Sequence, residues 1–121
     1  MMVSILEAIA RMEGWHDPAS RCRRNNNPGN IEAGRFATAH GACGSDERFA
    51  TFPTPEAGFA AMRALLSAPS YENLTVAEAI ARWAPANEND TAAYVRNVCE
   101  WCGCSPRDFV ARLLAEPVTN A

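Results

Sequence analysis

Apolar residues recur at helical spacing along most of the chain, and this pattern predicts about five helices. The first covers about residues 2–13, where Leu6, Ile9 and Ala10 share one face with Glu13, and Gly14 follows as a typical helix-ending residue. Each of the other four begins at a residue that favours a helix N-terminus and stops at a proline or glycine: residues 54–69, 75–85, 90–103 and 105–117.

Polar residues mark several of these helix starts. Thr54 precedes Pro55, a residue favoured at the first helical position, and Thr75 stands three residues before Glu78 in a capping box. The apolar stripes of the four later helices each contain an aromatic residue: Phe59, Met62 and Leu66; Val76, Ile80 and Trp83; Tyr94, Val98 and Trp101; Phe109, Leu113 and Leu114.

The segment between the first two helices has a different composition. Residues 15–53 are rich in Asn, Gly, Pro and Ser, which predicts mostly loop. Two short pieces, near residues 29–32 and 48–52, favour extended structure and could pair as a small hairpin. We therefore expect one mainly α domain over residues 1–121, with a small β hairpin after the first helix.

Composition and net charge limit the classes of protein to which the chain can belong. The chain has 121 residues, with ordinary apolar and charged fractions and a formal net charge of −3. The charge disfavours nucleic acid as the main partner, and no apolar run is long enough to span a bilayer. The N-terminus lacks the pattern of a secretory signal, so we expect a protein without a signal peptide.

Glu13 is the first candidate for chemistry. It stands in the last turn of the first predicted helix, where the negative end of the helix dipole disfavours an anion. Apolar neighbours such as Trp15 would desolvate it as well, so both effects favour the protonated acid, which can donate a proton to a leaving oxygen. The alternative is an ordinary surface glutamate in a frayed helix end.

A run of three asparagines follows, in Arg24-Asn25-Asn26-Asn27-Pro28-Gly29-Asn30-Ile31. The amides offer many neutral donors and acceptors, which suit sugar hydroxyls and acetamides. Pro28-Gly29 predicts a tight turn that presents Asn30 at a fixed angle. A turn stabilised by asparagine side chains is the competing interpretation.

These motifs carry a resemblance to a known family. The Arg-Asn-Asn-Asn-Pro-Gly-Asn-Ile block, Arg82-Trp83-Ala84-Pro85 and Glu88-Asn89-Asp90-Thr91, in that order, resemble bacteriophage and prophage proteins of the lysozyme superfamily, described as virion-associated or lysis transglycosylase-like. The similarity runs from about Ile5 to Gly103. Goose-type lysozymes and soluble lytic transglycosylases often carry Ser after the catalytic glutamate and a Gly-Leu-Met-Gln stretch; this chain has Gly14, and residues 28–31 in place of that stretch.

The resemblance implies a lysozyme-like fold and specific roles for several residues. Glu13 matches the catalytic glutamate, and Asn30 stands roughly where the glutamine amide does, so we expect Glu13 to open into an amide-lined groove within reach of Asn30. Asn27, Asn30, Glu88, Asn89 and Tyr94 become the candidate substrate-binding residues. For Tyr94 the alternative is a half-buried structural role. For Glu88 and Asn89, which stand just before the predicted helix at 90–103, the alternative is helix capping.

The expected substrate is the glycan strand of peptidoglycan, cleaved at the MurNAc-GlcNAc bond without a cofactor by a monomeric enzyme. Hydrolysis needs a second carboxylate, and Glu32, Asp46, Glu47 and Glu88 are loop candidates. A lytic transglycosylase needs one acid/base residue, which favours that reaction. A muramidase and a non-catalytic glycan-binding phage structural protein are the alternatives. The resemblance to phage proteins implies synthesis in the host bacterial cytoplasm without a signal peptide, and action on the periplasmic wall or within a virion.

Five cysteines complete the candidate chemistry, three of them within Cys99-Glu100-Trp101-Cys102-Gly103-Cys104. Zinc would need a fourth ligand, such as Cys22, Cys43, His16 or His40, and the spacing is weak for a metal site. The other interpretations are core thiols or a disulfide, for example between Cys22 and Cys43. We expect no metal.

Overall fold

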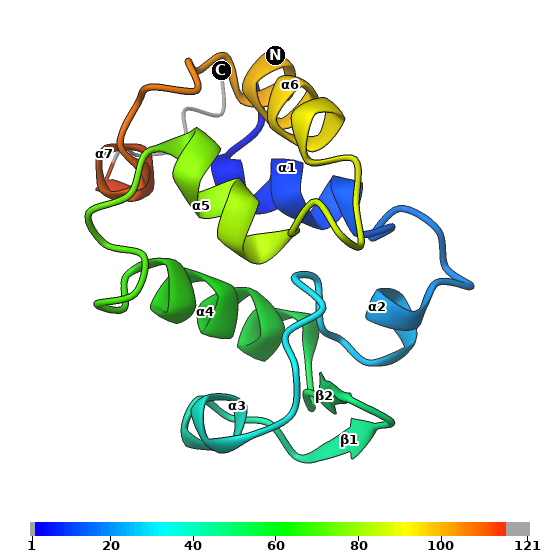
Figure 1. Cartoon of the computed structure of the whole chain (residues 1–121). Coiled ribbons are helices and arrows are strands. Elements are labelled where there is room, and N and C mark those ends of the chain that lie inside the picture. Colours follow the sequence, from blue (N-terminus) through cyan, green and yellow to red (C-terminus); the bar gives the residue numbers. More distant parts are fainter. Residues whose placement is uncertain (1, 116–121) are drawn as a thin grey trace. The chain divides into compact units, whose positions relative to one another are not determined.

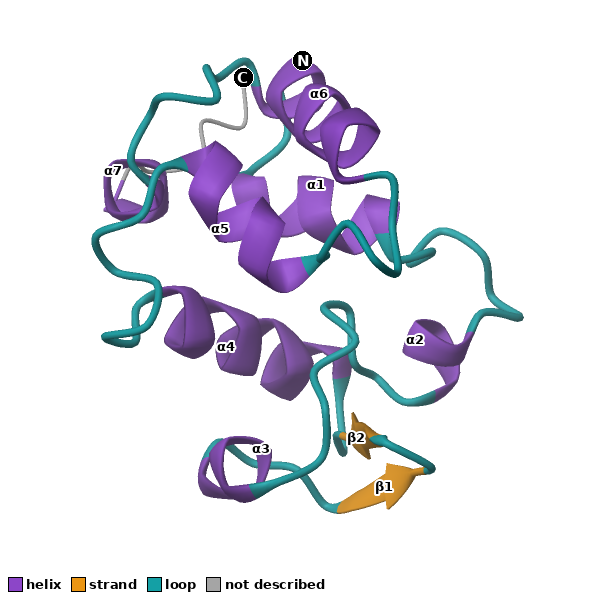
Figure 2. Cartoon of the chain, in the orientation of Figure 1, coloured by secondary structure: helices purple, strands orange, loops and turns teal. Residues whose placement is uncertain are grey.

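The structure, a computed structural model, describes residues 2–115 (Figure 1). It is mainly helical with one small β hairpin, as the sequence predicted (Figure 2). The described residues form seven helices and two strands, in the order α1 (Ile5–Met12), α2 (Arg21–Arg24), α3 (Arg35–Ala39), β1 (Gly44–Asp46), β2 (Phe49–Thr51), α4 (Pro55–Leu66), α5 (Val76–Trp83), α6 (Thr91–Cys102) and α7 (Val110–Ala115).

The chain divides into two compact units. One combines the chain up to Ala8 with the chain from Leu66 onward, and the other is Ile9–Leu65. Both boundaries between the units fall inside helices, after Ala8 in α1 and before the last residue of α4. The single domain expected over residues 1–121 stays a prediction. The two units are described separately below.

In the first unit, α5 packs with α6. The capping box predicted at the start of α5 is present: Thr75 Oγ1 accepts from the Glu78 backbone N–H, and the Glu78 carboxylate accepts from the Thr75 N–H at 2.9 Å. Asp90 caps α6, and Gly103 ends it in a left-handed conformation (φ 66°). The predicted stripes are buried at Val76, Ile80, Tyr94 and Val98, which form the core of this unit together with the residues Ile5, Leu6, Leu66, Tyr71 and Val110.

The last helix begins later than predicted. Residues 105–108 form a turn in which the Asp108 carboxylate accepts from the Ser105 N–H at 2.8 Å. Phe109 then pairs with Thr75 in an antiparallel bridge, which requires extended backbone, so α7 starts only at Val110. Phe109 is 56% exposed and is not a core residue as its stripe predicted. The predicted end before Pro117 lies outside the described residues.

The second unit contains α2, α3, the hairpin and most of α4. In the hairpin, β1 and β2 pair antiparallel with Ser45 opposite Ala50. The predicted extended piece at 48–52 therefore exists, but its partner strand is 44–46. The other piece joins only through an isolated bridge between Glu32 and Phe49, supported by the Ala50 N–H bond to the Ile31 carbonyl at 2.9 Å.

Two short helices, α2 and α3, were predicted as loop. They have four and five residues, too few for an apolar stripe to show a helical period. A local signal existed for α2, because Ser20 caps it by accepting from the Arg23 N–H. Helix α4 begins after Thr54, whose hydroxyl accepts from the Ala57 N–H at 3.1 Å, as the sequence predicted.

Candidate active site

Glu13 lies directly after α1 and is half-buried. Its N–H donates to the Ile9 carbonyl at 3.0 Å, so the helical turn continues through it. Gly14 follows with a φ of 100°, which reverses the chain at this point. The position predicted for the catalytic glutamate, at the end of the first helix, is therefore the observed one.

The backbone after Glu13 is fixed by contacts with the start of α2. A Cβ on Gly14 would lie 3.3 Å from the Ser20 Cβ, so a larger residue would crowd this turn as well as being strained at positive φ. The Cys22 thiol donates to the Glu13 carbonyl at 3.4 Å. Burial raises the pKa of the Cys22 thiol, so the thiol stays protonated and can donate this bond.

The buried side chain of Asn27 holds the conformation of residues 24–31, called the asparagine loop below. Its side chain is 0% exposed. The amide Nδ2 donates to the carbonyls of Ile31 and Ala50, each at 2.9 Å, and Oδ1 accepts from the Ile31 N–H at 2.9 Å. Because these bonds tie the loop to itself and to β2, Asn27 is a structural residue here, and we assign it no contact with substrate.

Asn25 and Asn26 attach the same loop to the end of β2. The Asn25 carbonyl accepts from the Phe52 N–H at 2.9 Å, and Asn26 Nδ2 donates to the Phe52 carbonyl at 3.1 Å. Asn26 has a φ of 51°, a left-handed conformation that asparagine tolerates better than most residues. The run of asparagines is thus largely used to build a rigid loop.

Asn30 connects this loop to Glu13. Its N–H donates to the Asn27 carbonyl at 3.0 Å, which closes the turn over Pro28-Gly29, and its φ is 48°. Its Nδ2 donates to Glu13 Oε1 at 2.9 Å. The expectation that Asn30 lies within reach of Glu13 is confirmed. The amide Oδ1 of Asn30 is buried and has no hydrogen-bond partner in the structure.

Gly58 in α4 is a residue whose importance the sequence analysis missed. A Cβ there would lie 2.1 Å from the Asn26 carbonyl oxygen and 2.6 Å from Pro28 Cδ, so only glycine allows α4 to approach the loop this closely. The available signal was a glycine inside an otherwise helical pattern, which marks a close backbone approach when it is not a cap.

Trp15 is held by two neighbours within the same unit. Its ring meets Phe59 edge-to-face, with centroids 5.4 Å apart, and the Arg23 guanidinium lies 4.9 Å above it. Arg23 also donates to the Trp15 carbonyl at 2.9 Å. The ring is half-buried, so α2 and α4 both fix the aromatic residue two positions after Glu13.

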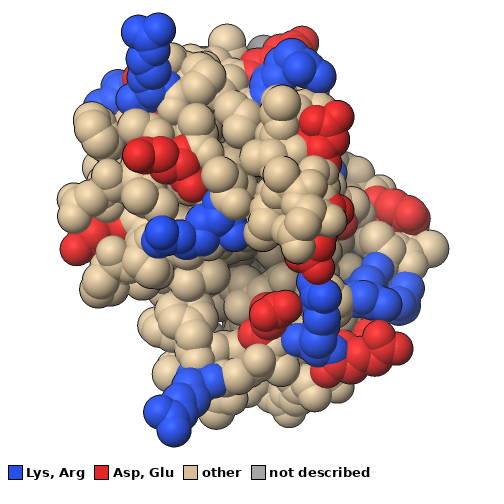
Figure 3. All heavy atoms as spheres, in the orientation of Figure 1, with Lys and Arg blue, Asp and Glu red and all other residues tan. Residues whose placement is uncertain are grey.

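Two of the candidate second carboxylates are paired with arginine. Glu32 lies 3.2 Å from Arg48, and Glu47 lies 3.7 Å from Arg21, both on the exposed surface around the hairpin. Asp46 lies in β1 and is half-buried. On the face shown in Figure 3, acidic and basic side chains are interspersed.

Glu88, Asn89 and Tyr94 belong to the other unit. Glu88 and Asn89 are exposed just before α6, and Asn89 Nδ2 donates to the Pro85 carbonyl at 3.3 Å. Tyr94 is buried, with 3% of its surface exposed, in agreement with its place on the apolar stripe of α6. Their role in substrate binding stays a prediction.

The five cysteines are free thiols. Cys22 is buried and Cys43 is exposed. Within residues 2–115, no group of three or more His, Cys, Asp or Glu side chains is arranged to hold a metal ion. No helix in this range has the length and apolar character required to cross a membrane.

No protein-family model matches the chain. The chain is similar to Protein P5 of Pseudoalteromonas phage PM2, with 37% identity over 91 residues. The match covers 70% of this chain and 57% of the phage protein, so the chain spans less than two thirds of that relative's length.

Proposed function

We propose that the chain is a peptidoglycan lytic transglycosylase that cleaves the MurNAc-GlcNAc bond with Glu13 as its general acid and base. The observation that carries the proposal is the 2.9 Å hydrogen bond from Asn30 Nδ2 to Glu13 Oε1. It comes from a loop whose conformation is fixed by buried bonds of Asn27, so a carboxyl at a helix end is held in one orientation.

The proposed reaction needs one carboxyl. The protonated Glu13 donates its proton to the glycosidic oxygen as the bond to C1 of the muramic residue breaks. The resulting carboxylate accepts the proton of the C6 hydroxyl of the same sugar while that oxygen bonds to C1. The products are a 1,6-anhydro-muramic end and a new GlcNAc end, and Glu13 returns to the acid form.

The amide of Asn30 suits both protonation states of Glu13. An amide presents a donor on one side and an acceptor on the other. With Nδ2 toward the carboxyl it stabilises the carboxylate; after rotation, the presently unpartnered Oδ1 would accept from the carboxylic acid O–H. An acid that alternates between the two forms is therefore matched by a side chain that can bond to each.

Transglycosylation is favoured over hydrolysis because a muramidase needs a free second carboxylate to act as nucleophile or base. Of the three candidates in the hairpin region, Glu32 and Glu47 form exposed ion pairs with Arg48 and Arg21, and Asp46 is half-buried in β1. The similarity to a phage protein supports a role in a phage or prophage, in lysis or in local penetration of the wall during entry.

The test is product analysis on purified sacculi by mass spectrometry. We expect wild-type protein to release fragments with anhydro-muramic ends, and Glu13→Gln to release none above background. Reducing muramic ends would instead identify a muramidase. If wild-type protein releases no more fragments than Glu13→Gln, the enzyme proposal is wrong and a glycan-binding structural protein is the better account.

Asn30→Gly tests the orienting role separately. Glycine tolerates the φ of 48°, so the loop keeps its conformation while the amide is lost. We expect the rate on sacculi to fall by about 100-fold, the scale at which misplacing a reacting group acts. The melting temperature should change little, and a variant as active as wild type would show that the bond to Glu13 has no catalytic role.

A further inference from the structure

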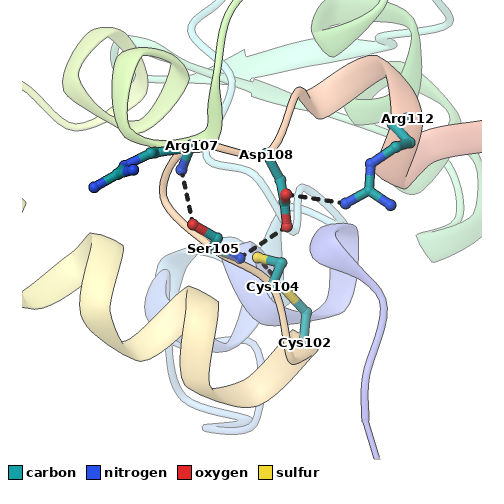
Figure 4. Close-up of polar contacts among 6 residues, drawn as sticks. All are labelled: Cys102, Cys104, Ser105, Arg107, Asp108 and Arg112. Atoms are coloured by element: carbon teal, nitrogen blue, oxygen red, sulfur yellow. Dashed lines mark hydrogen bonds and ion pairs between the residues drawn. The ribbon is translucent and has the colours of Figure 1, made fainter.

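Three cysteines meet at the end of α6, in a part of the molecule that the proposed function does not use. Cys99 and Cys102 lie in the last turn of the helix, and Cys104 follows Gly103. The Sγ atoms of Cys102 and Cys104 are 2.9 Å apart (Figure 4). A disulfide bond is about 2.05 Å long, so the two sulfurs would bond after an approach of about 1 Å.

The backbone holds this pair in place. Gly103 adopts a left-handed conformation, and the Cys104 N–H donates back to the Cys99 carbonyl at 3.1 Å, which folds Cys104 over the last turn of α6. Gly103 has a φ of 66°, which residues with a Cβ rarely adopt, so glycine is favoured at the reversal.

The segment after Cys104 is fixed as well. The Asp108 carboxylate accepts from the Ser105 N–H at 2.8 Å and lies 3.0 Å from the Arg112 guanidinium, as Figure 4 shows. The chain on both sides of the Cys-Gly-Cys turn is therefore held by hydrogen bonds and an ion pair that do not involve the thiols. The short distance between Cys102 and Cys104 is a consequence of the local fold.

The two thiols also differ from ordinary core cysteines in exposure. Cys102 and Cys104 are both half-exposed, whereas Cys99 is buried with 9% of its surface exposed. A small reagent in solution can therefore reach Cys102 and Cys104 more readily than Cys99.

We propose that Cys102 and Cys104 form a reversible dithiol–disulfide site that reacts with small disulfides such as glutathione disulfide. The site lies in the first unit and does not depend on the proposed action on peptidoglycan.

The reaction is ordinary thiol–disulfide exchange. The Cys102 thiolate attacks one sulfur of the small disulfide, forms a mixed disulfide and releases one thiolate. Cys104 loses its proton and attacks Cys102 Sγ, which forms the Cys102–Cys104 bond and releases the second thiolate. Two protein thiols are oxidised by two electrons, and one small disulfide is reduced to two thiols.

Electrostatics assign the order of attack. The hydrogen bond with Cys104 lowers the pKa of Cys102, and the same bond raises the pKa of Cys104. Burial raises the pKa of Cys99 to about 12, so this thiol is a poor nucleophile near neutral pH. Cys102 is therefore the thiol that reacts first.

The small size of the loop that the bond would close distinguishes this site from a disulfide that stabilises the fold. The bond would close a ring across a single intervening residue, Gly103, and such a small loop removes little entropy from the unfolded chain. Oxidation is expected to change the melting temperature slightly and to reverse on addition of a reducing thiol.

The test uses the folded full-length protein at low concentration with excess glutathione disulfide, followed by alkylation of the remaining thiols. Trypsin and a glutamate-specific protease then separate the cysteines, because Arg96, Glu100 and Arg107 flank them. One fragment, residues 97–100, carries Cys99, and the other, residues 101–107, carries Cys102 and Cys104.

We expect fragment 101–107 to be two hydrogens lighter and unalkylated after oxidation, and doubly alkylated after reduction. Fragment 97–100 should stay separate and alkylated. The exposed Cys43 is the internal control, since it should carry glutathione and thereby prove that the reagent acted. In Cys104→Ser, Cys102 should stop at the mixed disulfide and accumulate glutathione.

Three outcomes would overturn the proposal. One is a doubly alkylated 101–107 fragment when Cys43 has reacted. Another is a disulfide that links fragments 97–100 and 101–107, since this would assign the bond to Cys99. The third is a wild-type 101–107 fragment that retains glutathione as Cys104→Ser does.

Discussion

Asn27 and Asn30 show how the same side chain serves two purposes three residues apart. Asn27 is fully buried, and its amide forms hydrogen bonds with three backbone groups, so its role is to fix the conformation of the loop. Asn30 points the donor side of its amide at Glu13 Oε1. The chemistry assigned to Glu13 therefore depends on one asparagine for contact and on another for the position of that contact.

This division predicts that Asn27→Ala destabilises the fold. The Ile31 N–H and the carbonyls of Ile31 and Ala50 would lose their partner in a buried place, where each unmade bond costs free energy. We expect the free energy of unfolding to fall by about 2–4 kcal/mol, measured by chemical denaturation.

Asn73→Ala is the matched control, because Asn73 is exposed and the change should stay within about 0.5 kcal/mol. Equal stability of Asn27→Ala and wild type would contradict the structural role. Loss of activity in Asn27→Ala without loss of stability would return Asn27 to direct substrate binding.

At the scale of elements, α4 and the asparagine loop are packed backbone to backbone at Gly58. Alanine normally stabilises a helix relative to glycine, by up to about 1 kcal/mol. At this position the added methyl would overlap the Asn26 carbonyl oxygen, and overpacking of this kind costs about 1–3 kcal/mol. Gly58→Ala should therefore destabilise the protein in spite of its better helix propensity.

The measurement is thermal and chemical unfolding, with rates on sacculi as a second readout, since displacing the loop would also displace Asn30. Ala60→Gly, at an exposed position of the same helix, is the control and should cost about 1 kcal/mol or less without affecting activity. A stabilised Gly58→Ala variant would mean that the loop moves aside freely.

The start of α5 predicts a dependence of stability on pH. The bond from the Thr75 N–H lowers the pKa of Glu78 in the folded state. Between the pKa values of Glu78 in the folded and unfolded protein, the unfolded state binds more protons. The bond therefore stabilises the fold fully above the pKa of Glu78 in the unfolded chain, and this stabilisation is lost as the pH falls through its pKa in the folded protein.

Glu78→Gln keeps the shape of the capping box and removes the titrating group. We expect wild type to be the more stable of the two at about pH 6 and the difference to vanish by about pH 2, in denaturation curves at each pH. Glu72→Gln, at an exposed glutamate of the same unit, should show no such change. A difference that grows toward low pH would contradict the assignment.

At the scale of the whole molecule, the net charge of −3 bears on the proposed substrate. The wall is anionic, so long-range repulsion should slow the encounter at low ionic strength. Raising the salt from about 10 mM to about 150 mM shortens the Debye length from about 30 Å to about 8 Å. We expect the rate on intact sacculi to rise by about twofold or more over this range.

Sacculi with chemically amidated carboxyl groups are the control, since the rate on them should be insensitive to salt. A rate that falls with salt on native sacculi would show that a local basic surface, such as the arginines of α2, outweighs the net charge.

The sequence by itself determined what depends on neighbours within a few residues. The caps of α4, α5 and α6, the left-handed Gly103 and the place of Glu13 at the end of α1 all follow from local backbone bonding, which adjacent residue types specify. The mainly helical class and the small hairpin follow from the same patterns.

Only the tertiary structure decided which residues meet across the chain. The start of α7 at Val110, the contact of Gly58 with the asparagine loop and the bridge between Glu32 and Phe49 depend on segments far apart in sequence. So does the difference between Asn27 and Asn30, because burial and hydrogen-bond partners are properties of the packed fold. Local propensity cannot fix such pairings, since the free energy that selects them arises when distant segments pack together.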